Sequence, residues 1–280
     1  MGMQINTNVS ALNAYRNLSN TQNDLSKSLE KLSSGLRINR AADDAAGLAI
    51  SEGLRSQVNG LNVAARNAQD GISVIQTAEG ALTEVHSILQ RMRDLAVQAG
   101  NDSNNADSRN AIAKEATALT SELSRIADSS NFNGIQLLDG TAGTMGVLSF
   151  QVGADGANSG STISVDLTNA NVDTIVTNLG TLDFTTAAGA TAAIDTISTQ
   201  ITAVSSARAD LGAVQNRFES TINSLNVSAE NLSAAESRIR DTDMAAEMVK
   251  YTAANILSQA GTAMLAQANQ STQGVLQLLR

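Results

Sequence analysis

The sequence lacks cysteine, proline and tryptophan, and only 2% of its 280 residues are aromatic. Without cysteine the chain forms no disulfide, offers no thiolate to a metal and has no cysteine nucleophile. Without proline, no residue forces a helix to kink or stop. A core with few large rings must be built from leucine, isoleucine, valine and alanine, which favours packed helices.

The charge and the apolar runs exclude two classes of partner. The formal net charge is −9 and no basic block is present, which argues against nucleic acid and anionic membrane surfaces. No apolar run approaches the roughly 18 residues of a membrane span. The start, MGMQINTNVS, lacks the basic-then-apolar pattern of a secretion signal. If the chain is exported, the ordinary signal-peptide route is therefore not the one used.

Histidine is also scarce, which limits catalysis and metal binding. His86 is the only one, so a Ser-His-Asp triad or a histidine metal site would have to use it. Its neighbour Glu84 falls on another face of the expected helix. HExxH, phosphate-loop and dinucleotide-binding motifs are absent. The sequence predicts no catalytic, cofactor or metal site and no enzymatic activity.

The strongest positive pattern is a seven-residue repeat of apolar side chains. It predicts one long helix, and a second repeat far along the chain predicts another. The first repeat is Leu54, Leu61, Ala68, Ile75, Leu82, Leu89 and Ala96. The second is Ile197, Val204, Leu211, Phe218, Leu225, Leu232 and Ile239. A shorter stripe from Ile112 to Ile126 follows a turn cluster at 100–105, so a third helix folds back along the first. Mutual burial of these stripes predicts an elongated antiparallel bundle.

Residues 131–190 have a different pattern. VLSFQV (147–152) and STISVDL (161–167) alternate apolar and polar positions, with a glycine-rich segment between them. Alternation of this kind predicts a β-hairpin with a long loop. The fold class expected is therefore mainly α, an elongated antiparallel helical bundle or coiled coil with a small β-hairpin region. Residues 170–190 give no clear pattern.

The two ends carry weaker stripes in segments rich in alanine, serine, asparagine and glutamine. Isolated helices of this kind are marginal in water, so the ends need a partner to be ordered. Between the first terminal helix and the long helix stand Asp43 and Asp44. Adjacent residues on a helix point about 100° apart, which disfavours an acid/base dyad. We interpret the pair as a helix cap at a joint between Gly35 and Asp43.

LQRMRDLAVQAGN (89–101) leaves two interpretations open. Arg91 and Arg93 flank the apolar Met92, and Leu95 falls off the heptad positions, where it is expected to reach the surface. An ordinary solvated helix face accounts for these charges. A contact patch is the alternative, because arginine is enriched at protein interfaces.

An ordered series of motifs resembles bacterial flagellins over about 230 residues. Near the start the motifs are INTNVSALNAYRNL and LEKLSSGLRINRAADDAAGLAISEGLRSQVNGL. NAQDGISVIQTAEGAL, LQRMRDLAVQAGN and NFNGIQLLDG follow in order. RADLGAVQNRFESTINSLN, AESRIRDTDMAAEMVKYT and ILSQAGTAMLAQANQSTQGVLQLLR complete the series. The middle segment is short, which leaves little room for the outer domains found in some members of the family.

This resemblance implies a structural subunit that self-assembles into the helical filament of the extracellular bacterial flagellum. It places an inner filament-core domain at 1–43 and 236–280, and a helical rod with its hairpin at 44–235. The partners it implies are further copies of the chain, the flagellar export apparatus and an export chaperone, and the filament cap and hook-associated proteins. It implies no nucleic-acid partner and no membrane span.

The resemblance also implies an innate-immune partner. In flagellins recognised by the Toll-like receptor for flagellin, the recognised surface includes the residues that match Arg91, Leu95 and Glu115. Asp94 departs from the glutamate of many relatives. Three alternatives remain at this point: a hook-associated junction protein, a signalling bundle of the chemoreceptor type, and an enzyme carried as an insertion. Similarity through the rod, the lack of a membrane span and the lack of space for an insertion argue against them in turn.

Overall fold

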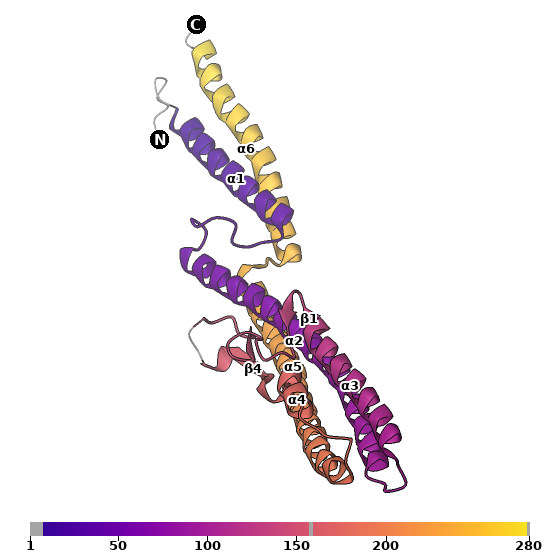
Figure 1. Ribbon diagram of the computed structural model, residues 1–280. Helices are drawn as coiled ribbons and strands as arrows, with labels where there is room; N and C mark the ends of the chain where they lie inside the picture. The colour runs from indigo at the N-terminus through magenta and orange to yellow at the C-terminus, as the bar shows by residue number, and fades with distance from the viewer. Residues whose placement is uncertain (1–7, 157–158, 279–280) are drawn as a thin grey trace. The chain divides into compact units, whose positions relative to one another are not determined.

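The computed structural model describes residues 8–156 and 159–278 (Figure 1). Its helices are α1 (Val9–Ser34), α2 (Ala45–Ala99), α3 (Ala106–Ser129), α4 (Val172–Leu179), α5 (Ala187–Arg240) and α6 (Met244–Leu278). Its strands are β1 (Asn131–Phe132), β2 (Ile135–Gln136), β3 (Val147–Gln151) and β4 (Thr162–Asp166). The three helices predicted from the heptad stripes are confirmed as α2, α3 and α5, and the fold class is confirmed as mainly helical.

The chain divides into two compact units. Unit 1 consists of Met1–Ser56 and Asn231–Arg280, and unit 2 of Gln57–Glu230. Among the described residues, no helix combines the length and the apolarity that crossing a membrane requires.

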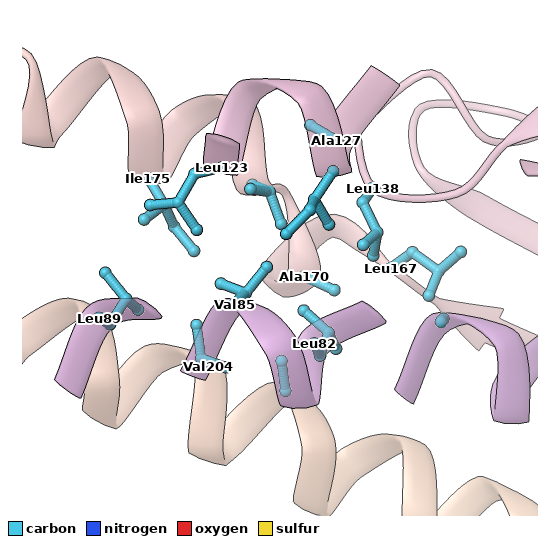
Figure 2. Close-up of a cluster of buried hydrophobic side chains, with 14 of the residues drawn as sticks. Leu82, Val85, Leu89, Leu123, Ala127, Leu138, Leu167, Ala170, Ile175 and Val204 are labelled. Carbon is cyan, nitrogen blue, oxygen red and sulfur yellow. The ribbon is translucent and has the colours of Figure 1, made fainter. Parts of the chain in front are cut away.

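The core of unit 2 lies where the stripe of α2 meets the stripe of α5. Ile75, Leu82 and Leu89 of α2 have no exposed surface, and neither do Val204 and Phe218 of α5. Figure 2 shows Leu82, Val85 and Leu89 facing side chains from the other layers. Leu123 and Ala127 of α3 are among these facing side chains. The apolar stripe of α2 is therefore covered by more than one neighbouring element.

The predicted hairpin is confirmed. β3 pairs antiparallel with β4, with Ser149 opposite Ser164 at its centre. Alternate residues after the start of β4 point into the core, and Ile163, Val165 and Leu167 are all buried. The ring of Phe150 meets the ring of Phe218 of α5 edge-on, with centroids 5.7 Å apart. The hairpin is thus held against α5 by apolar and aromatic contact.

Two elements in the middle segment were not predicted. β1 and β2 form a minimal hairpin around Asn133 and Gly134, which both have positive φ, at 50° and 81°. An Asn-Gly pair is a strong turn signal, but two-residue strands show no alternation. α4 buries Val172, Ile175 and Leu179 on one face. Eight residues are too few for the helical period to stand out in the sequence.

In unit 1, α1 and α6 lie side by side (Figure 1). The helices approach closely at Gly261, where an added Cβ would lie 3.2 Å from Leu18 Cδ1. At the start of α1, Asn8 accepts a hydrogen bond from the N–H of Ala11 and donates its amide to the carbonyl of Ala268 at 2.9 Å. Few side chains of this pair are buried, so its own apolar core is thin.

Candidate functional site

The segment between α1 and α2 is a turn held by backbone and carboxylate hydrogen bonds. α1 ends at Gly35, whose φ of 74° and N–H bond to the Lys31 carbonyl form a left-handed cap. Asp44 precedes α2, and its carboxylate accepts the N–H of Gly47 at 2.8 Å. Asp43 instead accepts the N–H groups of Asn39 and Arg40 at 3.1 and 3.0 Å. The two aspartates therefore serve different backbone groups.

The surroundings of Asp43 stabilise its charged form. The N–H groups of Arg40 and Asn39 that it accepts lower the pKa of its carboxyl below the ordinary value. The geometry is that of a loop and a helix start.

The same turn is bonded to the connection between α5 and α6. Arg37 donates its N–H to the carbonyl of Arg240 at 2.6 Å, and Thr242 donates to the carbonyl of Gly35 at 3.0 Å. The guanidinium of Arg37 reaches the carbonyl of Ile239, also at 2.6 Å. The turn between α1 and α2 and the connection between α5 and α6 are thus joined to each other by a short β-bridge.

A polar cluster lies beside this bridge, between α1 and α6. Glu247 of α6 has a side chain only 6% exposed, and Lys250 Nζ lies 3.1 Å from its carboxylate. Burial alone would raise the pKa of Glu247. A hydrogen bond from Ser28 and the nearby charges of Lys250 and Lys31 outweigh it, so the pKa lies below the ordinary value. Lys27 lines the same hollow of about 500 Å³.

Sequence reasoning missed this cluster, and the scarcity of lysine was the only feature of the sequence that bears on it. Only four lysines occur in the chain, and three of them, Lys27, Lys31 and Lys250, surround Glu247. The pairing across 220 residues of sequence could not be derived without knowing that α1 packs on α6.

Arg91 and Glu115 are joined on the surface of unit 2. The Nε and Nη2 atoms of Arg91 on α2 donate to the same carboxylate oxygen of Glu115 on α3, at 2.9 and 2.6 Å. Their side chains are 56% and 45% exposed. The structure therefore brings these two candidate residues together at an accessible position.

The expectation that Leu95 reaches the surface is wrong, since only 1% of it is exposed. Leu95 falls off the first heptad but belongs to a second one, with Val74, Ala81 and Ile88. Val74 is buried, and Ala81 and Ile88 are partly buried against the same core. α2 buries a band wider than a single stripe, because it is covered on two sides.

His86 has no catalytic surroundings in the described part of the chain. Its Nε2 lies 2.8 Å from Nε2 of Gln90, one helical turn away. Its Nδ1 is buried without a hydrogen-bond partner. No group of three or more histidine, cysteine, aspartate or glutamate side chains in residues 8–156 and 159–278 could hold a metal ion.

Most of the exposed large apolar side chains among the described residues lie on unit 1. Eleven of the sixteen exposed large apolar side chains among the described residues belong to that unit. They are Val9, Leu12, Tyr15, Leu29, Ile50, Met244, Met248, Val249, Ile256, Leu257 and Met264. An apolar surface of this extent on a helix pair with a thin core is typical of a protein-contact surface.

Two family models match the sequence. One, described as the bacterial flagellin N-terminal helical region, covers residues 5–143, and the C-terminal helical region of the same family covers residues 194–279. Together they span most of the chain and leave out the short middle segment with the hairpin and α4.

Several curated relatives are similar over almost the whole length. The flagellin of Halalkalibacterium halodurans is 56% identical over 99% of this chain and 100% of its own. The flagellin of Bacillus subtilis is 50% identical with the same coverage of both chains. The flagellar filament 33 kDa core protein of Treponema phagedenis is 49% identical, again over 99% and 100%. With both terminal regions matched and full-length relatives of this kind, the chain belongs to the bacterial flagellins, the structural subunits of the extracellular flagellar filament.

Proposed function

We propose that unit 1 holds neighbouring copies together at the inner core of the filament, and that unit 2 is the helical rod around it. The domain bounds predicted from the sequence, 1–43 and 236–280 for the core and 44–235 for the rod, differ from the bounds of the units, because unit 1 extends to Ser56 and begins again at Asn231. The observation that carries this proposal is the concentration of exposed large apolar side chains on α1 and α6.

The energetics of burial favour this role. Covering one exposed leucine, isoleucine or methionine contributes roughly 1.5–3 kcal/mol before the cost of ordering it. A surface of many such side chains supplies several times that amount. A free helix pair with a thin core has few other contacts to stabilise it. Assembly then both orders the terminal helices and buries their apolar faces.

The distribution of charge is consistent with the same division of roles. From Tyr251 to the residue before Arg280 the sequence contains no charged side chain, so the part of α6 after Lys250 can be buried without desolvating a charge. Unit 2, in contrast, has 18 acidic and 8 basic side chains, a net −10. Charged surface of that kind is suited to contact with solvent.

Further partners belong to the same proposal. Before assembly the chain passes unfolded through the flagellar export apparatus, accompanied by an export chaperone, and in the filament it meets the cap and hook-associated proteins. The lack of cysteine and proline supports this route, because refolding then requires neither disulfide formation nor prolyl isomerisation.

A second proposal concerns Arg91, Leu95 and Glu115. The Arg91–Glu115 pair is a contact for the Toll-like receptor for flagellin in the free chain, and for a neighbouring copy in the filament. Its support is the accessibility of both side chains and the capacity of a guanidinium to bond acceptors in a defined fork. Leu95 acts from beneath, by packing the turn of α2 that carries Arg91.

The role of unit 1 is tested by replacing one exposed apolar side chain of α6. Leu257 is 60% exposed, and Leu257→Asn removes its apolar surface without adding a charge. Gln267→Ala, at an exposed polar position of the same helix, is the control. The critical concentration for assembly, measured by sedimentation and checked by electron microscopy, should rise roughly tenfold for Leu257→Asn only. Equal critical concentrations for both variants and wild type would remove the basis of the proposal.

A further inference from the structure

The described methionines differ sharply in exposure. Met92 belongs to the core of unit 2 and is 1% exposed. The other four are Met145 of unit 2, at 85%, and Met244, Met248 and Met264 of α6, at 49%, 54% and 64%. The chain has no cysteine, so methionine thioethers supply its only sulfur atoms. A mild oxidant therefore meets four accessible thioethers in the described residues, and three of them stand on one helix.

The three methionines of α6 occupy two flanks of that helix. Met244 and Met248 are four residues apart, so one side chain stands a helical turn above the other. Met264 lies roughly half a turn around the helix from both, at about 100° per residue. Glu247 and Ala254, which are buried, mark the side between the two flanks, where α1 covers α6. Both flanks of the apolar surface on unit 1 therefore carry a thioether.

Hydrogen peroxide converts an accessible thioether to a sulfoxide. The sulfur lone pair attacks one peroxide oxygen, an S–O bond forms as the O–O bond breaks, and the proton of the transferred oxygen passes to the leaving hydroxide, which departs as water. The sulfur loses two electrons and the peroxide gains them. An apolar, flexible side chain thereby becomes a polar, chiral one with an acceptor oxygen.

The cost of this oxygen differs between a free and a buried α6. In the free chain all three side chains are about half exposed or more, so water hydrates the sulfoxide. Against the apolar surface of another copy the oxygen loses that water, and burying a polar group without a hydrogen-bond donor is unfavourable. A second α6 offers no cation to bond it, since Lys250 is the last charged residue before Arg280.

We propose that Met244, Met248 and Met264 form an oxidation-sensitive site that controls assembly. Sulfoxidation of the free chain by a peroxide blocks the contacts of α6, and assembly in turn shields the three thioethers from the oxidant. A methionine sulfoxide reductase with a thiol as reductant restores the site. The proposal rests on the role proposed for unit 1 and adds a modification that regulates it.

The first test treats the free full-length chain with hydrogen peroxide, removes the peroxide with catalase and measures the critical concentration for assembly by sedimentation. Oxidised wild type should show a critical concentration raised roughly tenfold or more. The variant Met244→Leu/Met248→Leu/Met264→Leu keeps apolar side chains without a thioether, so its critical concentration, whatever its value, should be the same before and after peroxide. Met145→Leu retains the three α6 methionines and is the matched control, which should respond as wild type does.

Two outcomes of this test would overturn the proposal. One is an equal response to peroxide in the triple variant and in wild type. The other is an unchanged critical concentration for wild type in which mass spectrometry of peptides shows the three α6 methionines oxidised and Met92 intact.

Reversal is tested on the same oxidised wild type. Reductases for both sulfoxide epimers, supplied with a thiol, return each sulfur to the thioether, release its oxygen as water and oxidise two thiols to a disulfide. The critical concentration should return to the untreated value as the sulfoxides disappear from the mass spectrum. A defect that persists after their removal would place the damage elsewhere and contradict the proposal.

The shielding is measured without any variant. Free chains and filaments of wild type receive the same peroxide, and the oxidation rate of each methionine is followed by mass spectrometry of peptides. Met244, Met248 and Met264 should oxidise at least severalfold more slowly in filaments than in free chains, and Met92 slowly in both. Equal rates for the α6 methionines in the two states would overturn the proposal.

These outcomes also separate this proposal from the one on which it rests. Poor assembly of untreated Leu257→Asn, together with normal assembly of oxidised wild type, would leave unit 1 its role and remove that of the methionines. Normal assembly in both cases would remove both roles.

Discussion

Two nitrogens of Arg91 on α2, Nε and Nη2, donate to one carboxylate oxygen of Glu115 on α3, at 2.9 and 2.6 Å. Leu95, one turn further along α2, is buried in the core of unit 2. An exposed ion-paired residue and a core residue thus lie four positions apart on α2. Their substitution is expected to have different effects on the stability of the fold.

Arg91→Ala should change the thermal stability of the free chain little, because exposed ion pairs contribute little to folding. Leu95→Ala should destabilise unit 2 by about 2–5 kcal/mol, because it leaves a cavity in the core. Denaturant unfolding of both variants measures the difference. In a receptor-activation assay, Arg91→Ala should lose signal while remaining folded. Full signalling by this variant would leave the pair as an ordinary solvated contact.

Leu211→Asp tests the bundle itself. Leu211 lies at the centre of the stripe of α5 and is 1% exposed, so the variant buries an unpaired charge and should lose more than about 3 kcal/mol of stability. Asp44→Asn is the contrasting variant, since asparagine caps a helix about as well as aspartate does. Thermal melts by circular dichroism should separate the two clearly. A wild-type melt for Leu211→Asp would contradict the packing of α5.

Much of this fold could be predicted because its main elements are long and periodic. Seven consecutive heptads identify α2 and α5 without knowledge of any contact, and alternation identifies β3 and β4. α4 is too short to show a period. Leu95 was misplaced because the width of the buried band on α2 depends on how many neighbours cover it, which the sequence of α2 does not contain.

The candidate sites also differ in how far the sequence alone could predict them. The patch near Arg91 could be noticed in sequence because Arg91 and Arg93 stand close together, whereas Glu115 was expected only from the resemblance to flagellins. The cluster around Glu247 requires α1 to pack on α6, which is a consequence of tertiary structure that composition and spacing do not report.

Glu247 should make the α1–α6 pair sensitive to acid. Its pKa in the folded state lies below the unfolded value of about 4.3, so ionised Glu247 stabilises the pair above that pH. The contribution is lost as the pH falls through the lower, folded-state pKa. Filaments of Glu247→Gln should therefore dissociate at a lower temperature than wild type near neutral pH, and the difference should vanish in strong acid. A difference that is constant with pH would exclude this carboxylate as its origin.

Assembly should become easier as ionic strength rises. Each copy brings a unit with a net charge of −10 close to its neighbours, and salt screens repulsion between exposed charges over about 10 Å at 0.1 M. The critical concentration for assembly should fall as sodium chloride is increased from low to moderate concentration. The apolar contacts of α6, which lacks charge after Lys250, should contribute little to this dependence. A critical concentration that rises with salt would indicate that attractive ion pairs between copies dominate.

The central claim is that α1 and α6 are stabilised by burial against other copies. Amide hydrogen exchange, followed by mass spectrometry on the free chain and on the filament, tests it most directly. The account predicts that amides of α1 and α6 exchange rapidly in the free chain and orders of magnitude more slowly in the filament. Amides in the core of α2 and α5 within unit 2 should be protected in both states. Equal protection of α1 and α6 in the free chain and the filament would contradict the account.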